Sequence, residues 1–401
     1  MSSFQEATRA LQNKHYRFFF LWQSVSFLGT WLQNTATSWL VYKLTESAFI
    51  LGIVSFAGSI PALFLTPFAG IIADSYSRKK IFMITQGMCL IQAIILTTLY
   101  FTHNLTILGI IILSLFLGIA NSFDMTARQS LVPSLIDRKH LSNAIALNSS
   151  MFNSARMIGP SIAGFLIAKF HEGSCFFLNA VSYIPIIIFL FFLKADSNVK
   201  KKIESPIKDL KEGVIFSWQQ KPIRALLLLD GAISFFCAPF ITLLPIFCNQ
   251  ILHQEAQGFG VLNGAAGIGA LLAALFLAVN KNILRINKII AFSTILLSIA
   301  LFSFAVSSIF FVSVLLLVFS GFSLVAIFAG SNTLLQAMSP DKLRGRIMSL
   351  FSFMLMGIYP LGSIFVGTVA ESIGAQYAVL LCAVITFFVG ISFILKLKYL
   401  T

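Results

Sequence analysis

The chain has 401 residues, of which 58% are hydrophobic and only 10% are charged. Soluble globular proteins carry about 25% charged residues, so this composition excludes an ordinary water-soluble domain and indicates a protein that spans a lipid bilayer. The formal net charge of +14 comes from short basic clusters between apolar runs, not from one basic surface. This distribution is typical of the cationic loops of a membrane protein and argues against a nucleic-acid partner.

The five cysteines lie within or at the ends of apolar runs, and the chain contains no C-x-x-C motif. We therefore expect these thiols to pack as small apolar groups, and we predict neither a disulfide nor a metal site. Residues 1–17 are polar and mildly basic, and the apolar run that begins at Phe18 is too long for a signal peptide. We expect this run to be retained as the first membrane span.

Twelve segments are apolar and long enough to cross a bilayer, for which an α-helix needs about 20 residues. The expected fold class is all-α, with twelve transmembrane helices. The longest polar stretch lies between the sixth and seventh segments, so we predict an N-terminal six-helix bundle (1–194), a cytoplasmic linker (195–222) and a C-terminal six-helix bundle (223–401). The predicted spans are 18–42, 47–73, 81–101, 105–126, 141–168, 175–194, 223–248, 258–279, 286–306, 309–337, 344–370 and 376–397.

The linker itself contains a helical pattern. Ser205-Pro206 is a typical helix start, and Pro222 ends the pattern. Apolar residues recur between them at helical spacing, namely Ile207, Leu210, Val214, Ile215 and Trp218. We predict a short amphipathic helix on the cytoplasmic membrane surface that tethers the two halves.

The orientation follows from the lysine and arginine residues, which are enriched in cytoplasmic loops. With a cytoplasmic N-terminus, all of the 28 basic residues except Lys43, Lys169 and Arg156 fall on the cytoplasmic side. Lys43 and Lys169 fall on the opposite side, and Arg156 lies inside a span. We therefore expect both termini in the cytoplasm.

The two halves also share local features. A basic loop follows the fourth span of each half, with Pro133 and Pro340 near the turn, and the fifth span of each half contains a proline, Pro160 or Pro360. These shared features indicate a transporter built from structural repeats, with its substrate site at the interface of the repeats.

The segment after the second span resembles motif A of the major facilitator superfamily. That motif has a glycine, an aspartate four residues later and a basic cluster, which are here Gly70, Asp74, Arg78 and Lys79. Ser75 and Ser77 depart from the motif, which usually has arginine and glycine at these places.

This resemblance implies a gate at the cytoplasmic side. Asp74 would face the positive N-terminal end of the eleventh span, and Arg78 would pair with Asp124 near the cytoplasmic end of the fourth span. Both contacts would hold the cytoplasmic side closed and would break when the transporter switches. The alternative is a basic loop with no gating role.

The fifth span resembles the Gly-Pro motif (motif C) of antiporters in this superfamily, which is here formed by Arg156, Gly159, Pro160 and Gly164. Small residues let helices approach closely, and proline bends the span. The resemblance implies a seal against proton leak, and the alternative is ordinary helix packing.

Residues 128–164, 260–269 and 343–349 resemble the bacterial subfamily that includes the enterobactin exporter and macrolide-efflux proteins. The resemblance implies the two-bundle fold of the superfamily, alternating access, a functional monomer and the inner membrane of a bacterium.

Asp230 is the one carboxylate well inside a predicted span. An ionisable residue there is costly and marks a functional site, so we expect Asp230 to carry the coupled proton. The alternative is a pair with Arg224 near the interface. Arg156 is a basic residue that lies inside a predicted span. Its guanidinium could hold an anionic substrate such as a catecholate or carboxylate, or it could have a structural role.

Polar residues on the expected cavity helices could contact the substrate or make interhelical hydrogen bonds. The candidates are Gln33, Asn34, Asn148, Asn153, Asn263, Asn332 and Gln336.

The sequence therefore predicts a secondary active transporter, not an enzyme, that exports a small amphiphilic molecule (siderophore or drug-like) by proton antiport. Its expected partners are this molecule, protons and the bilayer. No cofactor is expected, and the lack of a G-x-x-x-x-G-K-[ST] loop argues against ATP-driven transport by this chain. The alternatives are import of an iron chelate or other solute, lysolipid flipping, and, from another class, a membrane enzyme or channel. The five scattered histidines lack a neighbouring nucleophile and argue against an enzyme.

Overall fold

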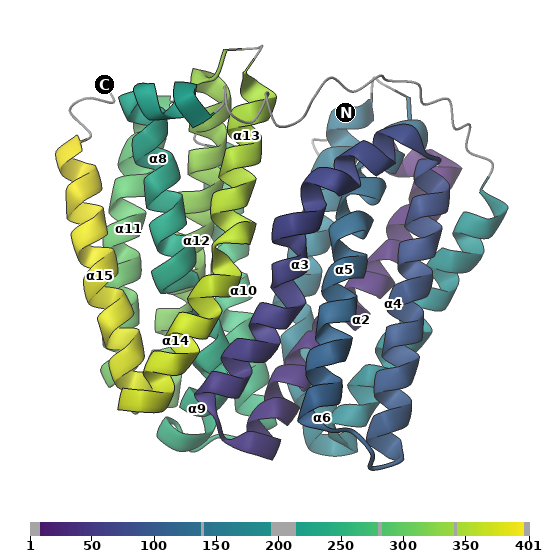
Figure 1. Cartoon of the computed structure of the whole chain (residues 1–401), viewed down its shortest axis with the longest axis horizontal. Helices are drawn as coiled ribbons and strands as arrows, with labels where there is room; N and C mark the ends of the chain where they lie inside the picture. Colours follow the sequence, from purple (N-terminus) through teal and green to yellow (C-terminus); the bar gives the residue numbers. More distant parts are fainter. Residues whose placement is uncertain (1–8, 138–139, 194–213, 280–282, 341–342, 397–401) are drawn as a thin grey trace. The chain divides into compact units, whose positions relative to one another are not determined.

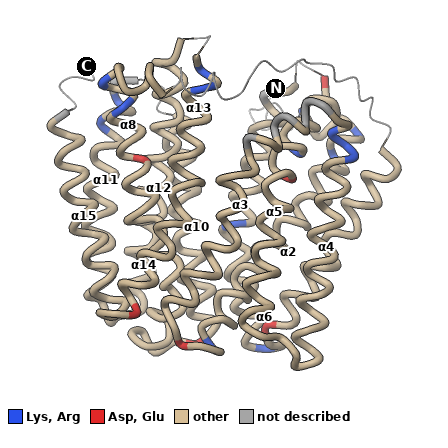
Figure 2. The backbone as a smooth tube through the Cα atoms, in the orientation of Figure 1, with Lys and Arg blue, Asp and Glu red and all other residues tan. Residues whose placement is uncertain are grey.

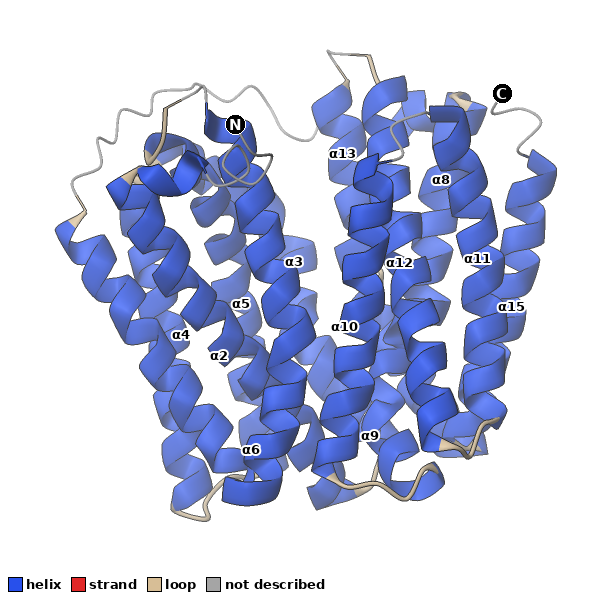
Figure 3. Ribbon diagram, turned by 180° about the vertical axis from the view of Figure 1, so that it is seen from behind, coloured by secondary structure: helices blue, strands red, loops and turns tan. Residues whose placement is uncertain are grey.

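The computed structural model describes residues 9–137, 140–193, 214–279, 283–340 and 343–396. Every regular element in these ranges is a helix (Figure 3). The predicted all-α class is therefore confirmed, and Figure 1 shows how the long helices are arranged side by side in each part of the molecule.

The first half contains five long helices with short connections. They are α2 (Lys14–Thr45), α3 (Ala48–Ser75), α4 (Arg78–Phe101), α5 (Ile107–Leu131) and α6 (Leu141–Phe192), with the 3-10 turns η1 (Arg9–Gln12) and η2 (Val132–Ser134) beside them. Within α6, the backbone at His171 has φ of 61° and ψ of 171°, which is not helical. This break separates the two spans predicted at 141–168 and 175–194.

The second half contains longer runs that are divided by irregular turns. They are α8 (Lys221–Ala232), η4 (Ile233–Cys237), η5 (Ala238–Leu243), α9 (Leu244–Ile246), η6 (Phe247–Ile251), α10 (Ala256–Val279), α11 (Ile283–Val306), α12 (Phe310–Met338), α13 (Arg344–Ser352), η7 (Phe353–Gly357), α14 (Tyr359–Ile373) and α15 (Ala375–Lys396).

Ten helical segments of the described residues are long and apolar enough to cross a membrane. One of them, Asn143–Phe192, holds two predicted spans because of the break at His171. The first predicted span lies in α2, which is 32 residues long but carries polar residues such as Gln33 and Asn34 that lower its hydropathy. With these two adjustments, the helices match the twelve predicted spans in order.

Two spans of the second half are irregular. The seventh runs from α8 through π-helical η4, η5, α9 and π-helical η6, and the eleventh runs from α13 through π-helical η7 into α14. Proline lies next to these irregular turns at Pro239, Pro245 and Pro360, where the missing N–H interrupts the helical hydrogen bonds. π-Helical turns are often found at functional sites.

Residue contacts divide the chain into two compact units. The first comprises Met1–Leu40 and Ile60–Lys202, and the second comprises Val41–Ser59 and Ile203–Thr401. The end of α2 and the start of α3 therefore group with the second unit. The predicted division into 1–194, 195–222 and 223–401 stays a prediction.

Hydrogen bonds explain why the turn between α2 and α3 groups with the second unit. The Oε2 atom of Glu371 in α14 accepts hydrogen bonds from the backbone N–H of Phe49 (3.1 Å) and the hydroxyl of Ser47 (3.0 Å). A carboxylate at the N-terminal end of a helix is stabilised by the helix dipole. The hydroxyl of Tyr42 also donates to Oδ1 of Asn249 (2.9 Å).

The basic residues gather at helix ends. Figure 2 shows most Lys and Arg residues of each unit near one end of its helices, the end at which α4, α8 and α13 begin. Of the predicted linker helix, residues 214–219 are helical and Trp218 is exposed. Residues 195–213 lie outside the described ranges.

Glycine permits direct backbone contact between α10 and α12 in the second unit. A Cβ atom added to Gly269 would lie 1.9 Å from the carbonyl oxygen of Val318, and one added to Gly321 would lie 2.0 Å from that of Ala266. Backbone atoms cannot yield as a flexible side chain would, so neither position has room for a larger residue.

We expect Gly269→Ala to destabilise the protein by about 1–3 kcal/mol, the usual cost of overpacking, and to lower its apparent melting temperature in detergent. Gly87→Ala is the matched control, because no atom lies within 4 Å of the added Cβ there. Equal melting temperatures for the two variants would contradict the direct contact of α10 and α12.

Candidate functional site

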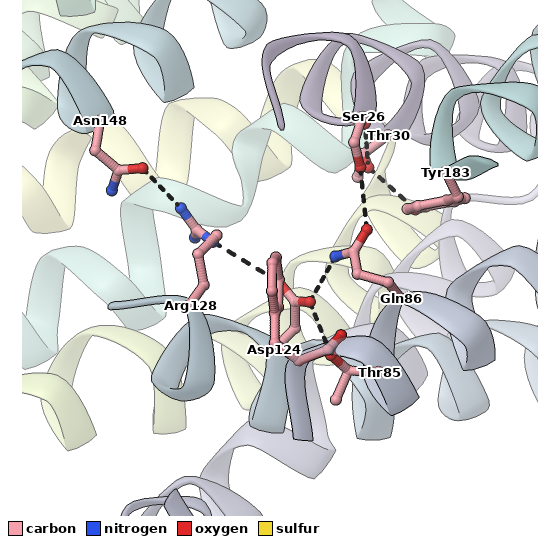
Figure 4. A network of polar contacts seen from close by, with 9 residues as sticks. Ser26, Thr30, Thr85, Gln86, Asp124, Arg128, Asn148 and Tyr183 are labelled. Atoms are coloured by element: carbon pink, nitrogen blue, oxygen red, sulfur yellow. Dashed lines mark hydrogen bonds and ion pairs between the residues drawn. The ribbon is translucent and has the colours of Figure 1, made fainter. Parts of the chain in front are cut away.

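The first unit contains a buried polar network centred on Asp124 of α5 (Figure 4). Oδ1 of Asp124 accepts hydrogen bonds from Oγ1 of Thr85 (2.9 Å) and Nε2 of Gln86 (2.6 Å), both on α4. Oδ2 lies 3.8 Å from Nε of Arg128, one helical turn further along α5. The carboxylate is thus both hydrogen-bonded and paired, as a buried charge must be.

The network continues to two more helices. Ser26 of α2 donates to Oε1 of Gln86 (3.4 Å), and Nη1 of Arg128 donates to Oδ1 of Asn148 on α6 (3.4 Å). The guanidinium carbon of Arg128 also lies 4.5 Å from the centre of the Phe27 ring. Asn148, a predicted substrate residue, is therefore connected with α2, α4 and α5 through Arg128 and Asp124.

A second polar chain crosses the same unit at Gln33. Its Nε2 donates to Oε1 of Gln92 (3.0 Å), and its Oε1 accepts from Nδ2 of Asn179 (2.8 Å). Gln33 is buried, with 2% of its surface exposed, whereas the neighbouring Asn34 is exposed. These contacts favour the interhelical alternative for Gln33 over substrate contact.

The motif A residues lie at the end of α3 and the start of α4. Nη1 of Arg78 donates to the carbonyl oxygen of Ser130 (3.1 Å), and Nζ of Lys79 donates to that of Phe191 (3.3 Å). Gly70 and Asp74 are in the last turns of α3, but the side chain of Asp74 lies outside the described part of the structure.

The expected pair between Arg78 and Asp124 is not formed among the described contacts. The cation beside Asp124 is Arg128, because a residue one turn away on the same helix faces the same side. Arg78 instead contacts Ser130, which is about 9 Å further along α5 than Asp124 at 1.5 Å per residue. The fourth predicted span, 105–126, is also too short, because α5 continues to Leu131 and contains the buried Arg128.

The Gly-Pro motif lies where α6 contacts α2. A Cβ atom added to Gly159 would lie 2.6 Å from Cβ of Trp31, so only glycine permits this approach. Pro160 and Gly164 are buried in the same helix. Arg156, one turn before Pro160, places its guanidinium carbon 5.9 Å from the centre of the Trp31 ring.

The second unit contains a different kind of buried acid. Asp230 of α8 is 0% exposed, and neither of its carboxylate oxygens has a hydrogen-bond partner among the described residues. The buried hydroxyl of Ser331 on α12 faces this carboxylate but does not meet hydrogen-bond geometry. The alternative partner, Arg224, instead donates to the carbonyl oxygen of Trp218 (3.2 Å).

The other predicted amides mostly bond within their own helices. Asn153 donates to the carbonyl of Ser149 (2.8 Å), Asn263 to that of Phe259 (3.1 Å), and Gln336 to Oδ1 of Asn332 (2.6 Å). Asn263, Asn332 and Gln336 belong to the second unit, and the other candidate amides belong to the first.

Sequence reasoning missed Arg128 and three aromatic residues around it and Arg156, namely Phe27, Trp31 and Phe152. The helical spacing of Phe27 and Trp31, and of Asp124 and Arg128, was the available signal. That spacing does not reveal which other helix each pair faces.

Comparison with known proteins places these features in a family. The model of a family described as transmembrane secretion effector matches residues 6–400. The chain is 28% identical over 372 residues to the staphyloferrin A transporter of Staphylococcus aureus, with 89% of this chain and 90% of that protein covered. It is 25% identical over 356 residues to the multidrug efflux pump Tap of Mycolicibacterium fortuitum, with 86% and 87% covered.

A further relative is the enterobactin exporter EntS of Citrobacter koseri, which is 26% identical over 339 residues, with 84% of this chain and 80% of that protein covered. Among solved structures, the nucleoside transporter NupG superimposes with a TM-score of 0.74 over 96% of this chain and 99% of that chain, at 18% identity. At this identity the likeness establishes the fold alone.

We expect Asp124→Ala to destabilise the protein by about 3–5 kcal/mol, because it leaves the buried Arg128 without its ion pair. The double variant Asp124→Leu with Arg128→Met removes both charges and should recover most of the loss in melting temperature. A double variant that melts no higher than Asp124→Ala would show that the unpaired charge is not the cause.

Proposed function

Because this chain belongs to the transmembrane secretion effector family of major facilitator superfamily transporters, we propose that it exports a small amphiphilic molecule, siderophore-like or drug-like, from the cytoplasm in exchange for protons. The chain is a multi-pass membrane transporter and not an enzyme. The relatives named as an efflux pump and as an enterobactin exporter support outward transport.

The main support for proton coupling is that Asp230 is buried without a hydrogen-bond partner among the described residues. An ionised carboxylate costs several kcal/mol when it is buried without a partner, and Asp230 has no partner in its described surroundings. A protonated acid removes that charge. If alternating access exposes this site to water, the proton can leave, so the same residue can take up and release one proton per cycle.

The second support is that the expected alternative partner of Asp230, Arg224, contacts another residue. A structural acid would have a fixed cation, as Asp124 has in Arg128. Arg224 is the nearest basic residue along α8, but its guanidinium lies over the Trp218 ring at 5.6 Å. The absence of a described cation beside Asp230 supports a titrating role for this residue.

The proposal includes the location of the chain. We place it in the bacterial cytoplasmic membrane as a monomer, with both termini inside. Its relatives are bacterial, and the basic residues gather at the helix ends where α4, α8 and α13 begin (Figure 2). Cationic segments are retained on the cytoplasmic side. In the proposed cycle, Gly70, Asp74, Arg78 and Lys79 gate that side.

The test is a proton-coupling assay in proteoliposomes that contain a pH-sensitive dye. Siderophores and drugs are added one at a time to vesicles with wild-type protein, with Asp230→Asn, or with Glu255→Gln as the matched acid-to-amide control at an exposed position. We expect substrate-dependent proton movement in wild type and Glu255→Gln, and at least a tenfold reduction in Asp230→Asn.

Three outcomes would contradict the proposal. Substrate flux without proton movement in wild type would exclude proton antiport. Full coupling in Asp230→Asn would exclude Asp230 as the proton site. Accumulation of a substrate by intact cells that express the protein, compared with cells that lack it, would reverse the direction to import.

A further inference from the structure

Three aromatic rings of the first unit form a continuous row between α2 and α6. The centre of the Phe152 ring lies 5.4 Å from that of Phe27 at an interplanar angle of 84°, and 6.1 Å from that of Trp31 at 65°. Phe152 is therefore the middle ring, in edge-to-face contact with both neighbours.

A guanidinium group lies at each end of this row. Arg128 is 4.5 Å from the centre of the Phe27 ring, and Arg156 is 5.9 Å from that of Trp31. We call these five residues the aromatic–guanidinium ladder: Phe27, Trp31, Arg128, Phe152 and Arg156.

Helical register explains why the ladder is continuous. Phe27 and Trp31 are one turn apart on α2, and Phe152 and Arg156 are one turn apart on α6, so each pair shares a face of its helix. Gly159, on the next turn of α6, lets the Cβ atom of Trp31 lie against that helix. The Gly-Pro motif therefore positions one ring of the ladder.

The ladder has a buried end and an open end. Phe27 and Arg128 are buried, whereas Trp31 and Arg156 are half-buried and Phe152 is 39% exposed. A guanidinium within a membrane span that faced lipid would be costly, and such groups face the bundle interior or a water-filled cavity. We therefore infer that a solute would reach the rings at the open end.

The charge of the ladder favours anions. Asp124 neutralises Arg128 at the buried end, and Arg156 adds a positive charge at the open end.

We propose that the aromatic–guanidinium ladder binds a planar anionic group of the transported molecule, stacked on Phe152 and Trp31 and paired with Arg156. A planar guanidinium binds a carboxylate or a catecholate through two parallel hydrogen bonds, and aromatic faces accept flat conjugated groups. The inference rests on the proposed transport function and narrows its substrate class to anionic amphiphiles, because the positive charge of Arg156 disfavours cationic ones.

The test compares three probes with the same flat ring system, namely 2-naphthoate, 2-naphthamide and 2-naphthylmethylamine. Their binding to the purified full-length protein in detergent is measured by equilibrium dialysis, with protein-free micelles subtracted. We expect wild type to bind the anion at least tenfold more tightly than the cation, with the neutral amide between them.

The variants separate charge from stacking. Arg156→Gln should remove the preference for the anion, Arg156→Lys should keep part of it, and Phe152→Ala should weaken all three probes. Lys169→Gln is the matched control, because Lys169 also lies over aromatic rings, those of Phe165 and Phe170, but outside the ladder. Melting temperatures confirm that each variant is folded.

The outcomes for binding and transport are distinct. Equal binding of anion and cation by wild type, or an unchanged preference in both Arg156 variants, would overturn the ladder as an anion site, whether or not proton-coupled export is observed. A preference for the anion that depends on Arg156 supports the ladder even if the proteoliposome assay finds no proton movement, which would contradict only the proposed function.

Discussion

The paired carboxylate of Asp124 is the constraint on which the first unit depends. Inside a membrane protein, polar groups must find partners within the chain, because lipid offers none. Thr85, Gln86 and Arg128 supply them for Asp124, and Ser26 and Asn148 connect the cluster with α2 and α6. One buried acid thereby links four helices, and the position of Arg128 beside Phe27 follows from it.

Asp230 is also a buried aspartate, but its surroundings differ from those of Asp124. Both acids are buried within spans, but Asp124 is surrounded by donors, whereas the oxygens of Asp230 have no hydrogen-bond partner among the residues described. A carboxylate with a cation and hydrogen-bond donors around it holds helices together. An unpaired one is stable when it carries a proton, and this difference is why we propose a structural role for one acid and a transport role for the other.

The second unit is characterised by close helix contacts at glycine residues and by interrupted helices. Gly269 and Gly321 bring the backbones of α10 and α12 into contact, and Gly362 does the same for α14 and η4, where an added Cβ would lie 2.2 Å from the carbonyl oxygen of Phe235. The π-helical turn η4 of the seventh span therefore packs against helix α14 of the eleventh span. Helices that are interrupted and closely packed at one place can shift there with small changes of backbone angle.

The sequence by itself determined the number and order of the spans, the all-α class, the family resemblance and the prominence of Asp230 and the Gly-Pro motif. These follow from local hydropathy, from the scarcity of acids within apolar runs and from short motifs. Tertiary structure alone decided that Arg78 contacts Ser130 and not Asp124, that Gln33 bonds with Gln92 and Asn179, and that Phe27, Trp31 and Phe152 meet. The partner of a side chain depends on which helix packs against its face. Hydropathy identifies a membrane span, but it does not identify the helix that packs against that span.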